Sequence, residues 1–291
     1  AELKKIDVKE VDMVVNPGSE SHARGRKDTF WLIDGLDLRM YSSLFELRLV
    51  SPHAYWYFEE GQNFSQAAIE RAADRFEKDI YPRIIAAFGK GWSPRVGKDP
   101  RLNILNAQIN GMGGYFSSSD QYPVSVNQFS NQRETIYINT AVISVDSPWY
   151  LEVLAHEFQH AVHWSTDASE DTWVNEGLSE LAITVAGFGQ SSIQRFLRSP
   201  PTSLIHWPMS TLGSGASYGA ASLFIHYLID HYGDINNVTP LLAEPKDGVN
   251  GINAYLESSG YHVTFRDLFR DWLVANVLDE GAGPYSYSNM E

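Results

Sequence analysis

Two histidines four residues apart, with a glutamate directly after the first, stand in the middle of an apolar segment of this chain. The segment, Leu151–Val162, reads LEVLAHEFQHAV. Its start carries a helix signal, because Ser147 can cap a helix and Pro148 suits the first helical position. Residues four apart lie one turn apart on one helix face, so His156 and His160 point together. A helix this apolar is predicted to be buried, where histidines and carboxylates need partners.

This spacing of histidine and glutamate is typical of a metal site. His156 and His160 can bind one zinc ion through their imidazole nitrogens. Glu157 is placed to act as a base towards a water acidified by the ion, without being a ligand. The chain has 9 His and 36 acidic residues among 291, so the pattern arises by chance in only about one or two of a hundred such chains. We therefore interpret the segment as a zinc-binding helix.

The third ligand is expected in the next helical stretch, because a catalytic zinc usually takes three protein ligands and leaves one position for water. This stretch, Thr172–Leu181, reads TWVNEGLSEL. Glu176 and Glu180 are four residues apart and share one helix face. One of them can bind zinc while the other orients a ligand histidine.

Composition narrows the possible classes of site and partner. The chain has no cysteine, which excludes disulfides, thiol chemistry and cysteine zinc sites. Its net charge of −14 argues against nucleic acid and anionic membranes as partners. An acidic surface can hold Ca²⁺, but charge alone does not establish a calcium site. No run of 18 apolar residues occurs, so we expect no membrane insertion.

The pattern of apolar residues predicts an α+β fold in three regions. Residues 1–60 are β-rich and are expected to form a small antiparallel sheet, with a hairpin turn at Asp34-Gly35. Residues 61–164 form a mixed α/β region that includes the motif helix, and residues 165–291 are expected to be mainly helical. In the middle region we expect a helix over Ser65–Phe88, kinked at Pro82, and strands at Leu102–Leu105 and Thr135–Val142. In the last region we expect helices at Trp173–Val185, Ser192–Leu197, Gly219–His231 and Phe265–Val277.

The two motifs together resemble the gluzincins, the thermolysin-like clan of zinc peptidases. The likeness extends to bacterial secreted peptidases of the hyicolysin and immune inhibitor A type, over roughly residues 60–285. It rests on HEFQH, on EDTWVNEGLSE at Glu170–Glu180, on Tyr218-Gly219-Ala220 and on DWLVAN at Asp271–Asn276. The resemblance implies a zincin-like fold, proteolysis and export. The protein would then be secreted or extracellular, with a signal and any pro-segment absent from this chain.

The resemblance also implies which glutamate binds the metal. The glutamate of Asn-Glu is the third ligand in thermolysin-type and aminopeptidase-type members, which corresponds to Glu176. Glu180 then matches the acidic partner of a ligand histidine. The loop between the two motifs departs from the family pattern. Counted from HEFQH, the spacing that thermolysin-type enzymes use for their ligand falls on Glu180. We expect Glu176, since loop length varies more easily than the start of a ligand-bearing helix.

Two further features are candidates for contact with substrate. Peptide hydrolysis builds an oxyanion that a Tyr or His donor can stabilise. Tyr218 resembles the catalytic tyrosine of aminopeptidase-type gluzincins and is expected just before an apolar helix at Ala220–Tyr227, and His206 is the next candidate. His163 is expected either to be structural or to support a metal ligand from behind. Gluzincins also pair an edge strand with the substrate backbone. Gly113, Gly114 and Tyr115 fit such a strand, because glycine allows close approach, and they equally fit an ordinary glycine turn.

These features lead us to expect a zinc-dependent peptidase that hydrolyses peptide bonds with a metal-activated water, acting as an endopeptidase on peptides or proteins. An aminopeptidase is one alternative, although it needs an acidic anchor for the free amine that the sequence does not reveal. A zinc-binding protein without catalysis is the other. Glu157 argues against it, because a purely structural site needs no base and usually closes its fourth position. The sequence makes no prediction of oligomeric state.

Overall fold

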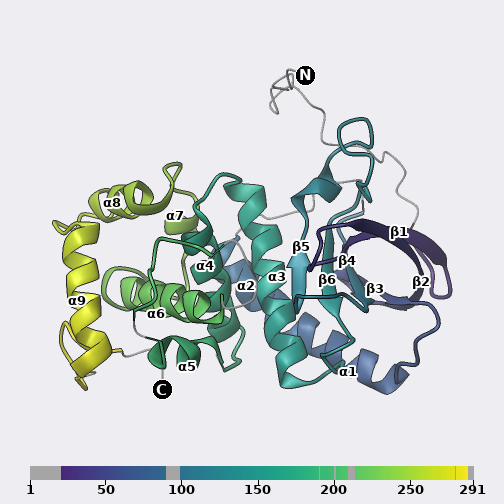
Figure 1. Cartoon of the computed structure of the whole chain (residues 1–291), viewed down its shortest axis with the longest axis horizontal. Helices are drawn as coiled ribbons and strands as arrows, with labels where there is room; N and C mark the ends of the chain where they lie inside the picture. The colour runs from purple at the N-terminus through teal and green to yellow at the C-terminus, as the bar shows by residue number, and fades with distance from the viewer. Residues whose placement is uncertain are drawn as a thin grey trace.

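The strands of the first half of the chain form one curled sheet of six, in the order β1-β2-β3-β4-β6-β5 (Figure 1). The computed structural model describes residues 21–89, 99–189, 191–199, 201–208, 214–278 and 280–287. The strands are β1 (Lys27–Ile33), β2 (Met40–Val50), β3 (Ala54–Glu59), β4 (Leu102–Ala107), β5 (Gly114–Phe116) and β6 (Thr135–Asn139). β3, β4 and β6 run parallel, while β5 runs antiparallel to β6 and lies at the edge of the sheet.

The first three strands do pair antiparallel, but they do not form a small sheet of their own. β3 also pairs in parallel with β4, with Ala54 opposite Leu102. The reason is visible in β3, AYWYFE, which is buried along nearly its whole length as is typical of an inner strand. The predicted boundary at residue 60 therefore falls between two strands of one sheet.

The helix expected over Ser65–Phe88 is present but changes its winding in the middle. It consists of α1 (Gln66–Arg75), a π-helical turn at Phe76–Ile80, and α2 (Tyr81–Phe88). Proline lacks an amide N–H and crowds the preceding turn, so it disturbs a regular helix there. The wider turn just before Pro82 accommodates this without a break in the helix.

The motif helix is confirmed as α3 (Pro148–Thr166). The hydroxyl of Ser147 accepts a hydrogen bond from the Tyr150 amide at 3.1 Å, as the sequence predicts for a helix cap. The strand before it, expected to reach Val142, ends at Asn139. The Asn139 side chain bonds the backbone of Ile109 and Met112 instead, which turns the chain out of the sheet.

The second half of the described chain is helical. Its helices are α4 (Thr172–Val185), α5 (Ser192–Leu197), α6 (Gly215–Tyr232), α7 (Thr239–Leu242), α8 (Gly248–Ser258) and α9 (Phe265–Leu278). Four of them confirm predicted helices, although α6 begins at Gly215 rather than Gly219. The sequence missed α7 and α8, because α7 is a single turn and α8 contains two glycines and two asparagines, which are poor helix formers.

α3 lies between the sheet and the helical half and belongs to one core shared by both (Figure 1). This core includes Trp56 from the sheet, Leu154 from α3 and Phe224 from α6. A second apolar cluster fills the other face of the sheet, with Phe30 and Tyr57 among its members. The predicted boundary near residue 164 thus separates two layers but not two cores. Within the described residues, no helix combines the length and the apolar character needed to cross a membrane.

Candidate metal centre

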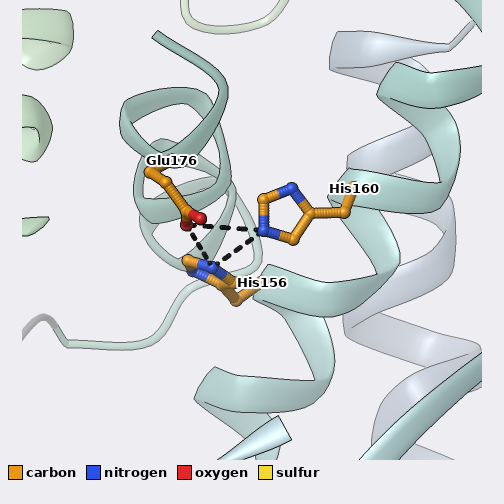
Figure 2. Close-up of side chains that lie close together, drawn as sticks. All are labelled: His156, His160 and Glu176. Atoms are coloured by element: carbon orange, nitrogen blue, oxygen red, sulfur yellow. Dashed lines mark hydrogen bonds and ion pairs between the residues drawn. The ribbon is translucent and has the colours of Figure 1, made fainter. Parts of the chain in front are cut away.

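The side chains of His156 and His160 on α3 and of Glu176 on α4 meet at one point (Figure 2). The Nε2 atom of His156 lies 3.1 Å from Nε2 of His160 and 3.1 Å from Oε2 of Glu176. Nε2 of His160 lies 3.4 Å from the same carboxylate oxygen. Within the described part of the chain, this is the one group of three or more His, Asp or Glu side chains placed to hold a metal ion.

α4 brings Glu176 to this point because it packs closely against α6. A Cβ atom on Gly177 would lie 2.6 Å from Cγ1 of Ile225 and 2.9 Å from the carbonyl oxygen of Ala221. Only glycine allows this approach. The glycine of Asn-Glu-Gly therefore sets the depth at which α4 presents Glu176.

The outer nitrogen of each histidine faces an acceptor. Nδ1 of His160 lies 2.6 Å from Oδ1 of Asn175, and Nδ1 of His156 lies 3.3 Å from Oε1 of Glu180. Amide and carboxylate oxygens only accept hydrogen bonds, so each Nδ1 carries the proton in the neutral ring. Each Nε2 then presents a lone pair towards the other histidine and towards Glu176. This arrangement could hold a cation among the three atoms.

The pKa shifts in the cluster show that it stabilises positive charge, carried either by a protonated imidazole ring or by a cation. Burial lowers the pKa of His156, but hydrogen bonds to Glu176 and Glu180 outweigh it and raise the pKa well above its usual value. Burial raises the pKa of Glu176, yet the charge of His160 and the bond to His156 bring it far below its usual range. Both shifts show that the cluster favours positive charge between its members.

Glu157 lies beside the cluster and against β5. Burial raises the pKa of its carboxyl group, while the neighbouring charges of His156 and His160 act in the opposite direction. Gly114 makes this closeness possible, since a Cβ there would lie 2.7 Å from the Tyr137 carbonyl oxygen and 3.3 Å from Cγ of Glu157. The raised pKa makes this carboxylate a stronger base than an exposed glutamate.

The edge of β5 that faces away from β6 borders the cleft, and the Phe116 amide on this edge donates to the Glu157 carboxylate. The amide of Asn139 donates to the carbonyl oxygen of Gly113 at 2.8 Å, so Gly113 faces β6. Backbone groups alternate in an antiparallel pair, which leaves those of Gly114 and Phe116 facing outward. Gly113 and Gly114 line the cleft as expected. Tyr115 does not: its ring points to the other face of the sheet and stacks on Tyr137 at 4.1 Å.

A cavity of about 290 Å³ opens at the centre, between β5 and the helices α3 to α6. Tyr218 lines it, with its ring centroid 6.0 Å from that of His156. It lies in the first turn of α6 rather than before the helix. The charge of Glu176, followed by burial, raises its pKa well above the usual value, so its hydroxyl stays protonated. His206 is exposed in the loop 201–208 and does not line this cavity.

Some residues around the centre were not singled out by the sequence. Asn175 stands next to Glu176 in the motif, and that adjacency was the available signal for its contact with His160. Ser179 lies 3.0 Å from the same histidine nitrogen. Ser192 donates to the second oxygen of Glu180 from α5. No local pattern marks Ser192, because the contact depends on the packing of a separate helix.

Two buried histidines lie outside the centre. His163 is fully buried on α3, and neither ring nitrogen has a hydrogen-bond partner among the described residues. The expectation that His163 is structural fits this position. His226 lies on α6, with Nε2 3.3 Å from the hydroxyl of Thr184. Burial lowers its pKa to about 4.

His226 is expected to make stability depend on pH. Its folded pKa lies below the value of about 6.5 in the unfolded chain, so folding favours the neutral ring. The resulting stability is fully present above pH 6.5 and is lost as the pH falls towards 4. From pH 7.5 to pH 4, the unfolding free energy of the wild type should fall by roughly 2–3 kcal/mol more than that of His226→Gln. Urea unfolding at both pH values measures this, and equal falls in both proteins would contradict it.

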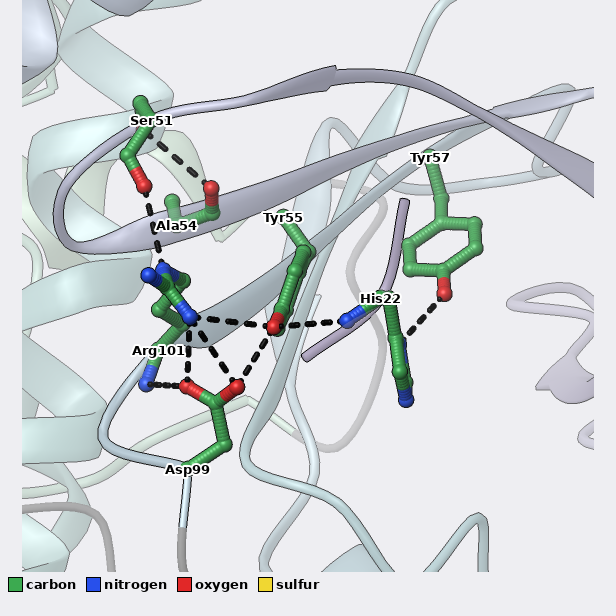
Figure 3. A network of polar contacts seen from close by, with 7 residues as sticks. All are labelled: His22, Ser51, Ala54, Tyr55, Tyr57, Asp99 and Arg101. Atoms are coloured by element: carbon green, nitrogen blue, oxygen red, sulfur yellow. Dashed lines mark hydrogen bonds and ion pairs between the residues drawn. The ribbon is translucent and has the colours of Figure 1, made fainter. Parts of the chain in front are cut away.

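A separate polar network lies on the opposite face of the sheet (Figure 3). The backbone amide of His22 donates to the Tyr55 hydroxyl at 3.0 Å, and its ring lies 2.9 Å from the Tyr57 hydroxyl. Arg101 contacts the Tyr55 hydroxyl and pairs with Asp99 at 3.1 Å. These contacts tie the start of the described chain to β3 and take no part in the centre.

A scan of the chain against protein-family models gives no match, and a search among curated proteins gives none either.

Proposed function

We propose that the protein is a zinc-dependent peptidase. The observation that carries the proposal is the convergence of two imidazole nitrogens and one carboxylate oxygen beside the buried Glu157, in an open cleft. Two histidines and a glutamate are a donor set of catalytic zinc, and tetrahedral bonds of about 2.0–2.2 Å hold ligand atoms about 3.3–3.5 Å apart. The observed separations of 3.1 to 3.4 Å are close to this. The position of Glu180, on the outer nitrogen of His156, supports Glu176 as the ligand.

The arrangement of layers supports a zincin-like fold. The motif helix packs against the sheet, an antiparallel strand forms the edge beside it, and the second half of the chain supplies the third ligand. Export from the cell follows from the resemblance to secreted peptidases and belongs to the same proposal.

His156, His160 and Glu176 would hold the ion. When bound, zinc supplies Lewis acidity, which polarises a peptide carbonyl and makes water acidic near neutral pH. The Glu157 carboxylate accepts the proton of the attacking water and then delivers it to the leaving amine. The outward backbone groups of Gly114 and the outward carbonyl group of Phe116 align the peptide by strand addition, while the Phe116 amide holds the Glu157 carboxylate. Asn175 and Glu180 hold the two imidazoles in the tautomer that directs Nε2 inward.

Tyr218 completes this mechanism as a donor to the oxyanion. Its hydroxyl is protonated at neutral pH and its ring stands beside that of His156. Tyr218→Phe removes the donor alone, and we expect kcat to fall about 10- to 1,000-fold. Zinc content and KM should change little. Steady-state kinetics of the variant measure kcat and KM, and elemental analysis measures its zinc content. An unchanged kcat would remove Tyr218 from the mechanism.

A library of N-terminally blocked peptides tests the proposal. Mass spectrometry of the products should show internal cuts that a chelator abolishes and zinc restores. Trimming restricted to peptides with a free amino terminus would favour the aminopeptidase alternative. A zinc-loaded protein that cuts neither blocked nor free peptides would favour a zinc-binding protein without catalysis.

A further inference from the structure

A second cavity, of about 300 Å³, shares β5 with the metal cleft. It lies between β1 and β5 and continues past the end of β5 to the 3₁₀ turn at Ser118–Gln121. Aromatic side chains make up one part of its walls, and Ser117–Asp120 and Asn127 make up most of the polar part. Among the described residues, no lysine or arginine lines it. The aromatic residues are Trp31, Tyr115, Phe116, Phe129 and Tyr137.

The aromatic walls are fixed by their own contacts. Trp31 and Phe129 pack edge to face at 5.0 Å, and Tyr115 stacks on Tyr137 at 4.1 Å. The Tyr137 hydroxyl bonds the carboxylate of Asp120, which also accepts from the amide of Asn131 at 2.7 Å. A wall held in this way needs little reordering when a ligand enters, which favours binding.

The edge of β1 that borders the cavity is closed to another strand. The amide of Trp31 donates to the side chain of Asn131 at 2.8 Å, and the amide of Ile33 donates to the Tyr115 hydroxyl at 3.1 Å. The Asn131 side chain also donates to the Trp31 carbonyl oxygen at 2.9 Å. With these backbone groups occupied, the cavity suits a side chain rather than an added strand.

The edge of β5 gives direction to a bound peptide. Along a strand, successive side chains point to opposite faces of the sheet. The Cβ position of Gly114 faces α3 and Glu157, whereas the Tyr115 ring faces the cavity side. A peptide added to β5 would therefore send every second side chain to the cavity side. Antiparallel pairing is the more stable arrangement, and it places residues that precede the cleaved bond beside Phe116 and Ser117.

The distance along the strand limits which residue reaches the cavity. Glu157 stands beside Gly114 and accepts a hydrogen bond from the Phe116 amide, and the cavity begins at Tyr115 and Phe116. Because a strand advances about 3.3 Å per residue, only the first few residues before the cleaved bond can reach it. The polar atoms of Asp120 and Tyr137 already bond each other, and no basic residue offers a partner to an acidic side chain. The walls thus favour an aromatic side chain.

We propose that this cavity is a subsite for an aromatic side chain of a peptide substrate, within three residues on the amino side of the cleaved bond. The inference rests on the proposed peptidase function, which supplies the bond and the direction. It makes the aromatic wall around Trp31 and Phe129 a determinant of specificity.

Binding to a Glu157→Gln protein tests the subsite without turnover. The probes are fluorescently labelled, N-terminally blocked octapeptides of alanine and serine, with or without one phenylalanine. Fluorescence anisotropy should show about tenfold tighter binding with phenylalanine. Adding Phe129→Ala, or Trp31→Ala at the ring packed against it, should abolish the difference. Tyr261→Ala, which removes a ring from the helical half, should preserve it.

Cleavage of the same peptides by the wild type gives the position. The subsite predicts cuts one to three residues after the phenylalanine. The subsite would be overturned by equal affinity with and without phenylalanine, or by a preference that survives both cavity variants. Cuts before the phenylalanine would overturn it as well. Binding that depends on phenylalanine and on Phe129, without any cleavage, would leave the subsite standing and refute the peptidase function instead.

Discussion

Glu157→Gln is expected to lower the rate of peptide hydrolysis about 100- to 10,000-fold, the range that a positioned general base contributes. Glutamine has nearly the same shape but cannot accept the proton of the attacking water. Glu157 is not one of the three residues placed to bind the metal, which are His156, His160 and Glu176. Zinc content should therefore stay at about one ion per chain, the stoichiometry of a mononuclear catalytic site.

Cleavage of a blocked peptide and elemental analysis of the same preparation measure the two effects together. Glu257→Gln on α8 makes the same substitution at an exposed position and should change neither quantity. If Glu157→Gln retained comparable activity, Glu157 would not be the base. If it lost zinc along with activity, its role would be to build the site rather than to transfer a proton.

His160→Ala is expected to have the largest effect on metal binding. It removes one of three converging donor atoms and leaves Asn175 without its imidazole partner. Loss of a residue that only hydrogen-bonds a metal ligand costs about 10- to 100-fold in metal affinity. Loss of a ligand itself should therefore weaken zinc binding more than about 100-fold. Competition with a chelating dye measures the affinity.

Thermal unfolding gives a second measure of the same loss. A ligand present at about 1,000 times its dissociation constant stabilises the folded state by about 4 kcal/mol. Added zinc should therefore raise the melting temperature of the metal-free wild type but not that of His160→Ala. His206→Ala removes an exposed histidine outside the cleft and should behave as the wild type does. Full zinc affinity in His160→Ala would exclude this residue as a ligand.

Local signals in the sequence predicted the helix that carries the centre. Ser147 and Pro148 marked the start of α3, and the four-residue step placed His156 and His160 on one face. The same reasoning placed Glu176 and Glu180 together on α4. Spacing alone would choose Glu180 as the ligand, whereas the Asn-Glu motif chose Glu176. The outer nitrogen of His156 faces Glu180, while its inner nitrogen faces Glu176.

Contacts between distant segments were beyond sequence reasoning. β3 and β4 are separated by more than forty residues, and parallel pairing over that distance leaves no local trace. The start of α6 was missed because glycine and serine are weak helix formers. In the structure, Arg195 packs over Gly215 and the backbone of Ser192 lies against Gly219. These tertiary contacts override the local preference and place Tyr218 on a helix.

The metal content of the purified protein, measured together with casein cleavage before and after chelation, tests directly whether the protein is a zinc-dependent peptidase. We predict about one zinc per chain, as in a mononuclear catalytic site, with cleavage that is lost on chelation and restored by zinc. A protein that binds no zinc even after reconstitution would contradict the account.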